Sequence, residues 1–401
     1  MILSDYSAST LCEQLQDIIN EDWLHCRVCA QLTSIIITLA GTSRVMSVFH
    51  HQSVPTVIPG YHSQKAYEIQ PEDASSILRV AAYHRQDFDR AVISFPPNAH
   101  PKSITSTLPD STAPTTLGQL EKLPLELLHN ICLELDVASL FRFRQTNTRA
   151  RQVLGALHEY RVITTHAIDP LCALLRTGVA KTVILSDFYR LLCTQQCSLC
   201  FGSHGNLVHL ALWRRCCSSC LRRNHTTIQM APLSATKLSR KSLARLPTLV
   251  TLPGTYSMEE RPGTKRLTLV PALAAFSAYR EEQAEIASSS ALIDRFKMRH
   301  RPSSLTHMAC CAMPSFDPQT GQIQNGVSCA GCQLALEDDI IRSKGPWACE
   351  VRDAVYSHDD FLQHFTRCEQ AQLLWTSSKG GTIKPPKLPQ SCQDGGFFKP
   401  E

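Results

Sequence analysis

The chain has 401 residues, more than one hydrophobic core usually holds, so two or three folded modules are expected. Apolar residues make up 43% of it, which excludes a chain that is disordered throughout, and a net charge of +5 does not by itself indicate a nucleic-acid partner. No window approaches 18 consecutive apolar residues, and the first ten residues lack a secretory pattern. We therefore expect a soluble intracellular protein, in the cytoplasm, the nucleus or both, with no membrane partner.

The 18 cysteines are many for such a chain. Disulfides do not persist in a reducing compartment, so cysteines at short spacing indicate metal binding. Cys26 and Cys29 form a C-x2-C pair with no second pair nearby, and we interpret them as structural. Four isolated cysteines are expected to be small buried side chains: Cys12, Cys132, Cys172 and Cys392.

The first part of the chain, residues 1–95, has short apolar runs without a clear period, so the sequence leaves its folding undecided. Residues 96–116 are rich in Pro, Ser and Thr, which predicts a linker. We find no repeat of 20 to 50 residues, which excludes a propeller or a solenoid.

Residues 117–166 have the pattern of three short helices. Pro124 suits the first turn of a helix, because its missing N–H would have no partner there. Asp136 and Asn147 are expected to cap the second and third helices. Apolar residues recur at steps of three and four along one face: Leu127, Leu128, Ile131 and Leu135. The pattern alone does not decide whether this face packs within the chain or binds a partner.

The residues of this segment resemble an F-box. The run L-x-x-L-P-x-E-L-L-x-x-I begins at Leu120, and L-D-x-x-S-L follows from Leu135. The continuation to residue 167 is similar to fungal F-box proteins that carry a Cys-rich, zinc-binding C-terminal region. The resemblance implies docking on a Skp-family adaptor of a cullin–RING ubiquitin ligase. It also implies that six residues face this adaptor: Leu123, Pro124, Leu127, Ile131, Leu135 and Leu140.

A first metal site is predicted within residues 193–225. Two C-x2-C pairs, separated by sixteen residues, supply the four thiolates that tetrahedral zinc requires: Cys197, Cys200, Cys217 and Cys220. Four neighbours remain as alternative ligands: Cys193, Cys216, His204 and His209. The intervening residues predict a glycine turn and a short apolar strand. A RING domain is excluded, because the next cysteine is Cys310. The zinc is expected to be structural.

A second site is predicted within residues 310–376. Turn dipeptides at Asp317-Pro318 and Asn325-Gly326 predict a hairpin that leads into the pair Cys329 and Cys332. A helix capped by Ser357 would place His364 and Cys368, four residues apart, on one face. Cys329, Cys332, His364 and Cys368 would then form a ββα finger with a 31-residue insert. Cys349, His358 and the pair Cys310-Cys311 remain alternatives. The same fungal set resembles this segment too.

The expected fold is mainly α. It consists of the three-helix F-box and of a helical and zinc-binding region, residues 167–376, with small α+β segments. The N-terminal part and the tail, residues 377–401, are expected to be partly disordered. No phosphate-binding glycine loop, G-x-S-x-G or H-E-x-x-H motif is present, which argues against an enzyme. The F-box resemblance implies a non-catalytic substrate receptor of a Skp–cullin–F-box ligase with an unknown protein substrate. The cysteine pairs predict one or two structural Zn²⁺ ions. The alternative is a zinc-finger nucleic-acid-binding or regulatory protein. Asp359, Asp360 and Glu369 would repel phosphate, which argues against a nucleic-acid partner.

Overall fold

The computed structural model describes residues 60–96, 99–100, 104, 116–236, 238–284, 303–341 and 346–398. The chain divides into two units, Met1–Thr56 and Val57–Glu401, and the described residues all belong to the second. The pair Cys26 and Cys29, Cys12 and most of the predicted linker lie outside the described residues. The described fold is mainly α with several two- and three-stranded sheets, as expected. No described helix is long and apolar enough to cross a membrane.

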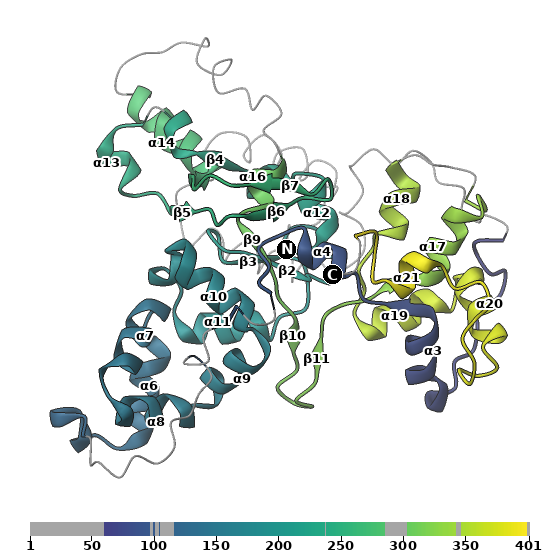
Figure 1. The fold of residues 1–401 in the computed structure, drawn as a ribbon, viewed down its shortest axis with the longest axis horizontal. Helices are drawn as coiled ribbons and strands as arrows, with labels where there is room; N and C mark the ends of the chain where they lie inside the picture. Colours follow the sequence, from purple (N-terminus) through teal and green to yellow (C-terminus); the bar gives the residue numbers. More distant parts are fainter. Residues whose placement is uncertain are drawn as a thin grey trace, which may run out of the picture. The chain divides into compact units, whose positions relative to one another are not determined.

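The predicted F-box segment forms short helices that continue into a larger helical group (Figure 1). A 3₁₀ turn, η2, precedes three α-helices: η2 (Gly118–Lys122), α6 (Leu125–Glu134), α7 (Val137–Thr146) and α8 (Thr148–Ala156). Three further helices and a 3₁₀ turn follow: α9 (His158–His166), α10 (Ile168–Thr177), η3 (Val179–Lys181) and α11 (Leu185–Leu192). The predicted caps are confirmed: Asp136 Oδ1 accepts from Ser139 N at 2.9 Å, and Asn147 Oδ1 accepts from Ala150 N at 2.8 Å.

A three-stranded antiparallel sheet follows the helical group. The strand β2 (Leu207–His209) is the short apolar strand that the sequence predicted. It pairs with β3 (Arg214–Cys216), and α12 (Ser218–Arg222) comes directly after. The third strand, β9 (Cys310–Ala312), pairs with the other edge of β2. The cores of the helical group and of this sheet are continuous, since Leu154, Phe188 and Val208 belong to one cluster of buried side chains.

The middle of the chain adds a second three-stranded sheet and a hairpin. The sheet has the order β4-β8-β5: β4 (Met230–Pro232), β5 (Leu249–Val250) and β8 (Thr268–Pro271). The hairpin is β6 (Gly254–Tyr256) with β7 (Arg261–Gly263). Two 3₁₀ turns and three helices complete this part: η4 (Thr226–Ile228), η5 (Leu233–Ala235), α13 (Arg240–Leu243), α14 (Ala272–Ala284) and α16 (Ser303–His307).

The C-terminal part begins with a hairpin, which four helices follow. The predicted hairpin is present as β10 (Ser315–Phe316) and β11 (Ile323–Gln324). It leads into β12 (Ser328–Cys329) and four helices: α17 (Ala330–Glu337), α18 (Pro346–Arg352), α19 (His358–Phe365) and α20 (Glu369–Ser377). These helices surround a core that includes Phe361, Phe365 and Trp375.

The sequence left the folding of residues 60–96 undecided. Their first part joins this C-terminal core, through Tyr61 and Ile77, and their end packs against the sheet of β9, through Val92 and Ile93. Residues 60–96 form η1 (Pro71–Asp73), α3 (Ala74–Ala81), β1 (Ala82–Tyr83) and α4 (Gln86–Arg90). Strand β1 pairs with β12, with Ala82 opposite Cys329, and α3 lies beside α20 (Figure 1). Ile77 of α3 is fully buried in the same cluster as Phe361.

The expectation of a disordered tail from residue 377 needs correction for residues 377–398. This stretch contains a short helix, α21 (Gln390–Gln393), and Cys392 is buried against Tyr83 and Leu374. Phe397 N donates to Asp87 Oδ2 at 3.1 Å. The Gly- and Pro-rich composition of the tail suggested disorder. Composition could not reveal that Tyr83 and Asp87, which are distant in sequence, contact this stretch.

Candidate adaptor-binding surface and metal centres

Helix α6 presents two different faces. Leu128 and Cys132 point into the protein and are buried, whereas Leu127 and Ile131 are 48% and 46% exposed. The stripe that the sequence suggested as one face is therefore divided between the interior and the surface. The outer side chains line a shallow groove of about 490 Å³, made of Leu123, Leu127, Asn130, Ile131, Glu134 and Leu135.

One of the six predicted adaptor-facing residues is not on this surface. Leu140 is 1% exposed and belongs to the same core cluster as Leu154. The start of α7 is fixed against residues 183–185, because Val137 N donates to Val183 O at 2.9 Å and Leu185 N donates to Leu135 O at 3.0 Å. This contact turns Leu140 inward, so its assignment to the adaptor surface is wrong for this structure.

Pro124 is exposed and lies one position before the helix, as the N-cap residue of α6. Its carbonyl accepts hydrogen bonds from Leu127 N and Leu128 N, so it starts the helix without needing an N–H of its own. Two further leucines of this segment are exposed, Leu120 and Leu125, which the sequence analysis did not assign to the surface. The pattern showed them as apolar positions next to Leu123, but did not show which way they point.

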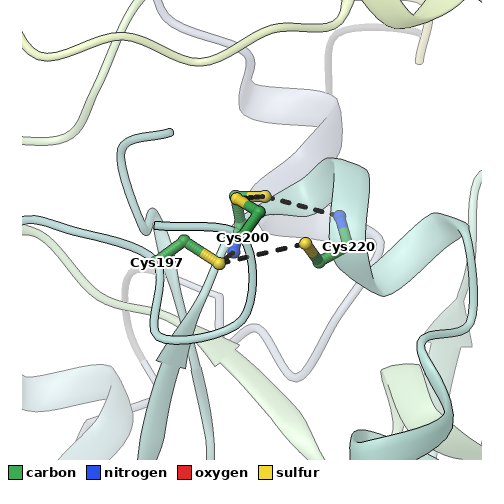
Figure 2. A group of neighbouring side chains, drawn as sticks. Cys197, Cys200 and Cys220 are labelled. Atoms are coloured by element: carbon green, nitrogen blue, oxygen red, sulfur yellow. Dashed lines mark hydrogen bonds between the residues drawn. The ribbon is translucent and has the colours of Figure 1, made fainter. Parts of the chain in front are cut away.

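The four cysteines of the first predicted site are brought together, and their sulfurs all lie within 4.8 Å of one another. Cys197 and Cys200 lie in the loop after α11, Cys217 is the N-cap residue of α12, and Cys220 lies within that helix. Figure 2 shows the sulfurs of Cys197 and Cys220 turned toward each other, 3.9 Å apart. The sulfurs of Cys200 and Cys217 are 3.8 Å apart. Zn–S bonds of about 2.3 Å in a tetrahedron place sulfurs about 3.8 Å apart, so this geometry fits a metal ion of that size.

Backbone amides point at two of these sulfurs. Cys197 Sγ accepts from Leu199 N at 3.4 Å and from Cys217 N at 3.3 Å, and Cys217 Sγ accepts from Cys220 N at 3.4 Å. Such hydrogen bonds stabilise thiolates and fix their orientation toward a bound ion. Phe201, directly after Cys200, has a φ of 55°, the left-handed conformation that bends the chain at the end of the loop.

The four thiols affect one another's ionisation. Contacts with Cys197, Cys217 and Cys220 hold the pKa of Cys200 well below its usual range, whereas contacts with Cys197, Cys200 and Cys220 raise the pKa of Cys217. Four sulfurs at this distance cannot all be thiolates unless a cation lies among them. The group is therefore suited to a divalent metal ion and unsuited to an apolar core.

The alternative ligands of the first site lie elsewhere. His209 is fully buried, and its Nε2 pairs with Ile228 O at 3.1 Å. Cys216 ends β3 with its side chain near Cys310, and His204 packs against Gly326. Neither these three residues nor Cys193 is part of the four-sulfur group.

The second predicted site is also assembled, and its four ligand atoms lie within 4.8 Å of one another. The sulfurs of Cys329 and Cys368 are 3.7 Å apart, and Cys332 Sγ lies 3.3 Å from His364 Nε2. Three sulfurs and one imidazole nitrogen are a common ligand set of structural zinc sites. The alternatives Cys349, His358, Cys310 and Cys311 are not part of this group.

The backbone around the second site differs from the predicted ββα finger. Cys332 lies in the first turn of α17, and Cys329 is the N-cap residue of that helix. The predicted long helix is interrupted: α19 ends at Phe365, and Cys368 is the N-cap residue of α20. A turn at residues 366–368 brings His364 and Cys368 together where we expected one continuous helix. The predicted cap of α19 is confirmed, since Ser357 Oγ accepts from Asp360 N at 3.1 Å.

Tyr61 belongs to the second site, although the sequence analysis did not find it. Its hydroxyl lies 3.2 Å from Cys332 Sγ, and Glu369 N donates to Tyr61 O. Burial raises the pKa of Tyr61, so its hydroxyl keeps its proton and can donate to Cys332 when that sulfur is a metal-bound thiolate. No local pattern could reveal this contact, because the two residues are 271 positions apart.

The family model of the F-box domain matches residues 120–161, from η2 into α9. No curated protein and no solved structure matches the chain. F-box domains bind Skp-family adaptors, and the exposed groove of α6 lies within the matched segment. Residues 120–161 are therefore an F-box domain, as the sequence pattern predicted.

Proposed function

We propose that this chain is a non-catalytic substrate receptor of a Skp–cullin–F-box ubiquitin ligase. Its F-box binds the Skp-family adaptor, and the C-terminal region binds a protein substrate. The observation that carries the proposal is the exposed apolar groove on α6, which lies inside the segment that matches the F-box domain.

The distribution of exposed apolar side chains supports a partner at this place. Nine large hydrophobic residues are exposed in the described part of the chain, and four of them lie between positions 120 and 131. Exposed apolar groups that gather in one patch indicate an interface, whereas single ones are ordinary. A Skp-family adaptor that covers Leu127 and Ile131 would remove this surface from water.

Co-purification tests the proposed adaptor contact. The full chain is expected to retain a Skp-family adaptor, and the double substitution Leu127→Asp/Ile131→Asp is expected to weaken binding at least tenfold, because two charges would enter an apolar contact. Leu273 is a matched control, since it is an exposed leucine on α14. Leu273→Asp should leave binding unchanged. Equal retention of the adaptor by both variants would overturn the proposal.

We further propose that both metal groups hold structural Zn²⁺. Each group has four protein ligands, whereas catalytic zinc keeps one position for water. Purified chain is expected to contain two zinc ions, one for each group. Cys200→Ser and Cys329→Ser should each lower the zinc content by about one ion, and Cys193→Ser should not. A chain purified without zinc and unaffected by chelators contradicts this part.

The nucleic-acid-binding alternative is not supported by the second site. Helix α19 carries Asp359 and Asp360, both exposed, in its first turn. These carboxylates would face phosphates if the helix entered a groove of DNA.

For a ligase receptor we propose a location in the cytoplasm, the nucleus or both, which imaging of a tagged chain would test.

A further inference from the structure

A groove of about 630 Å³ lies between the two metal groups. One wall comes from the first group: Gly202 and Ser203 follow Cys200, and Ser219 lies between Cys217 and Cys220. The other wall comes from α18, α19 and the turn before α20, and it includes the ligands His364 and Cys368. The groove therefore exists only where both metal-binding loops are folded. Its volume lies within the range of ligand sites in proteins.

The groove offers an apolar surface to a ligand. Trp347 and Tyr356 line it and are half-buried, so each keeps part of its ring accessible. Phe201 adjoins the lining residue Gly202 and is 65% exposed, the largest exposed fraction among the large hydrophobic residues of the described chain. Aromatic side chains that remain accessible at a groove favour the burial of another apolar or aromatic side chain.

The groove carries two carboxylates, Glu350 and Asp360, and two guanidinium groups, Arg223 and Arg367. Glu350 pairs with Arg223 at 3.7 Å, and Asp360 Oδ2 accepts from Ser357 Oγ at 2.7 Å. Arg367 lines the same groove, is exposed, and has no acidic partner within salt-bridge distance among the described residues. An exposed guanidinium group without an acidic partner favours a ligand carboxylate, because the planar group can donate two hydrogen bonds to the carboxylate.

We propose that this groove binds an extended segment of the protein substrate that carries an acidic residue next to an aromatic one. The acid pairs with Arg367, and the aromatic ring packs against Trp347 and Tyr356, which both line the groove. The side chain of Gln363 is exposed at the same wall and can form hydrogen bonds with a peptide group of the bound segment. This inference rests on the proposed receptor function and adds the chemistry of the segment that the receptor recognises.

Fluorescence anisotropy with the zinc-loaded full chain tests the inference. The probes are two fluorescein-labelled pools of ten-residue peptides with Gly, Ser and Ala flanks, one with a central Glu-Phe pair and the other with Lys-Phe. The Glu-Phe pool is expected to bind at least tenfold more tightly. Arg367→Glu should reverse this preference, Arg367→Gln should abolish it, and Trp347→Ala should weaken the binding of both pools.

A matched control is Arg240→Glu, which changes an exposed arginine of α13 outside the groove and should leave the preference intact. Equal binding of the two pools, binding of neither, or an unchanged preference in Arg367→Glu would overturn the inference. Zinc content and thermal unfolding of each variant show that it is folded. Retention of the Skp-family adaptor is measured in parallel, so the loss of adaptor binding and the loss of peptide binding are separate results.

Discussion

Arg215 is the largest fully buried side chain in the described part of the protein, and it has no acidic partner there. Its guanidinium donates only to backbone carbonyls: those of Leu191, Leu192, Gly205, Met313 and Pro314. The first two carbonyls end α11, where the helix dipole is negative and stabilises a cation. Arg215 thus joins the end of α11, the loop between the two cysteine pairs of the first metal group and the segment before β10.

We predict that Arg215→Met lowers the free energy of unfolding by about 3–5 kcal/mol, because several buried carbonyls lose their donor at once. Arg214 is adjacent in sequence but exposed, and Arg214→Met should change the free energy by less than about 0.5 kcal/mol. Urea denaturation measures both. A similar small effect of the two substitutions would contradict this role of Arg215.

His84 lies between two acceptors. Its Nδ1 is 3.2 Å from Gly326 O and its Nε2 is 2.6 Å from Asp89 Oδ2, so a doubly protonated ring can donate to both. Burial lowers the pKa of His84, but the hydrogen bond and charge of Asp89 outweigh burial and raise it. A raised pKa in the folded state means that the stabilising contribution is complete at low pH and is lost as the pH rises above the folded pKa.

We therefore predict that His84→Gln destabilises the protein by about 1–2 kcal/mol at pH 6, and that the difference from the wild-type chain shrinks as the pH rises toward 9. Protonation of the metal-binding cysteines also changes stability with pH, but it affects both chains equally. The difference in free energy between the two chains at each pH therefore does not contain it. Asp89→Asn should reproduce the trend. A difference that stays constant over this range would contradict the assignment.

At the scale of elements, α6 and α7 divide the predicted adaptor residues into two kinds. Leu127 and Leu140 have the same side chain, and the F-box resemblance implied the same role for both. In the structure Leu127 is exposed on α6, whereas Leu140 is buried in the core on α7. Their truncation should therefore have different consequences.

We predict that Leu140→Ala lowers the free energy of unfolding by about 2–5 kcal/mol, the usual cost of removing a buried leucine side chain. Leu127→Ala should change stability by less than about 0.5 kcal/mol, since its side chain is largely in water, and should weaken adaptor binding. Thermal unfolding and adaptor titration, carried out on both variants, separate the two effects. A stable Leu140→Ala variant with lost adaptor binding would restore the original assignment.

At the scale of the whole described unit, Asp353 connects three segments that are distant in sequence. Its carboxylate is fully buried and pairs with Arg85 at 2.6 Å, with Arg222 at 2.5 Å and with Arg352 at 2.8 Å. Arg85 precedes α4, Arg222 belongs to α12 next to the first metal group, and Arg352 ends α18. Burial opposes ionisation, but the three arginines hold the pKa of Asp353 at about 2.

We predict that Asp353→Asn lowers the free energy of unfolding by about 3 kcal/mol, because the three arginines lose their shared buried counter-ion and Arg85 keeps its pair with Asp87, whereas Arg222 and Arg352 are partly buried. Asp187→Asn removes an exposed pair with Arg190 on one helix and should cost less than about 0.5 kcal/mol. Chemical denaturation measures both losses. Equal stability of the two variants would show that this network does not hold the segments together.

The sequence correctly predicted the cysteine pairs and the helix caps, because the residues that contact each other in them are close along the chain. The C-x2-C pairs place two sulfurs beside each other whatever surrounds them, and Asp136, Asn147 and Ser357 cap helices that begin at the next residue. His364 and Cys368 come together even though the predicted helix is broken between them, because a turn also closes a distance of four residues.

The sequence by itself thus determined the F-box segment, the two groups of metal ligands and the mainly α fold, since spacing and periodicity are local properties of the chain. Only the tertiary structure decided that Leu140 is buried, that α3 joins the C-terminal core and residues 377–398 pack beside it, that Tyr61 contacts the second group and that a groove separates the two groups. These outcomes depend on contacts between residues that are tens to hundreds of positions apart. Burial and packing in the complete fold determine such contacts, so a local sequence pattern does not predict them.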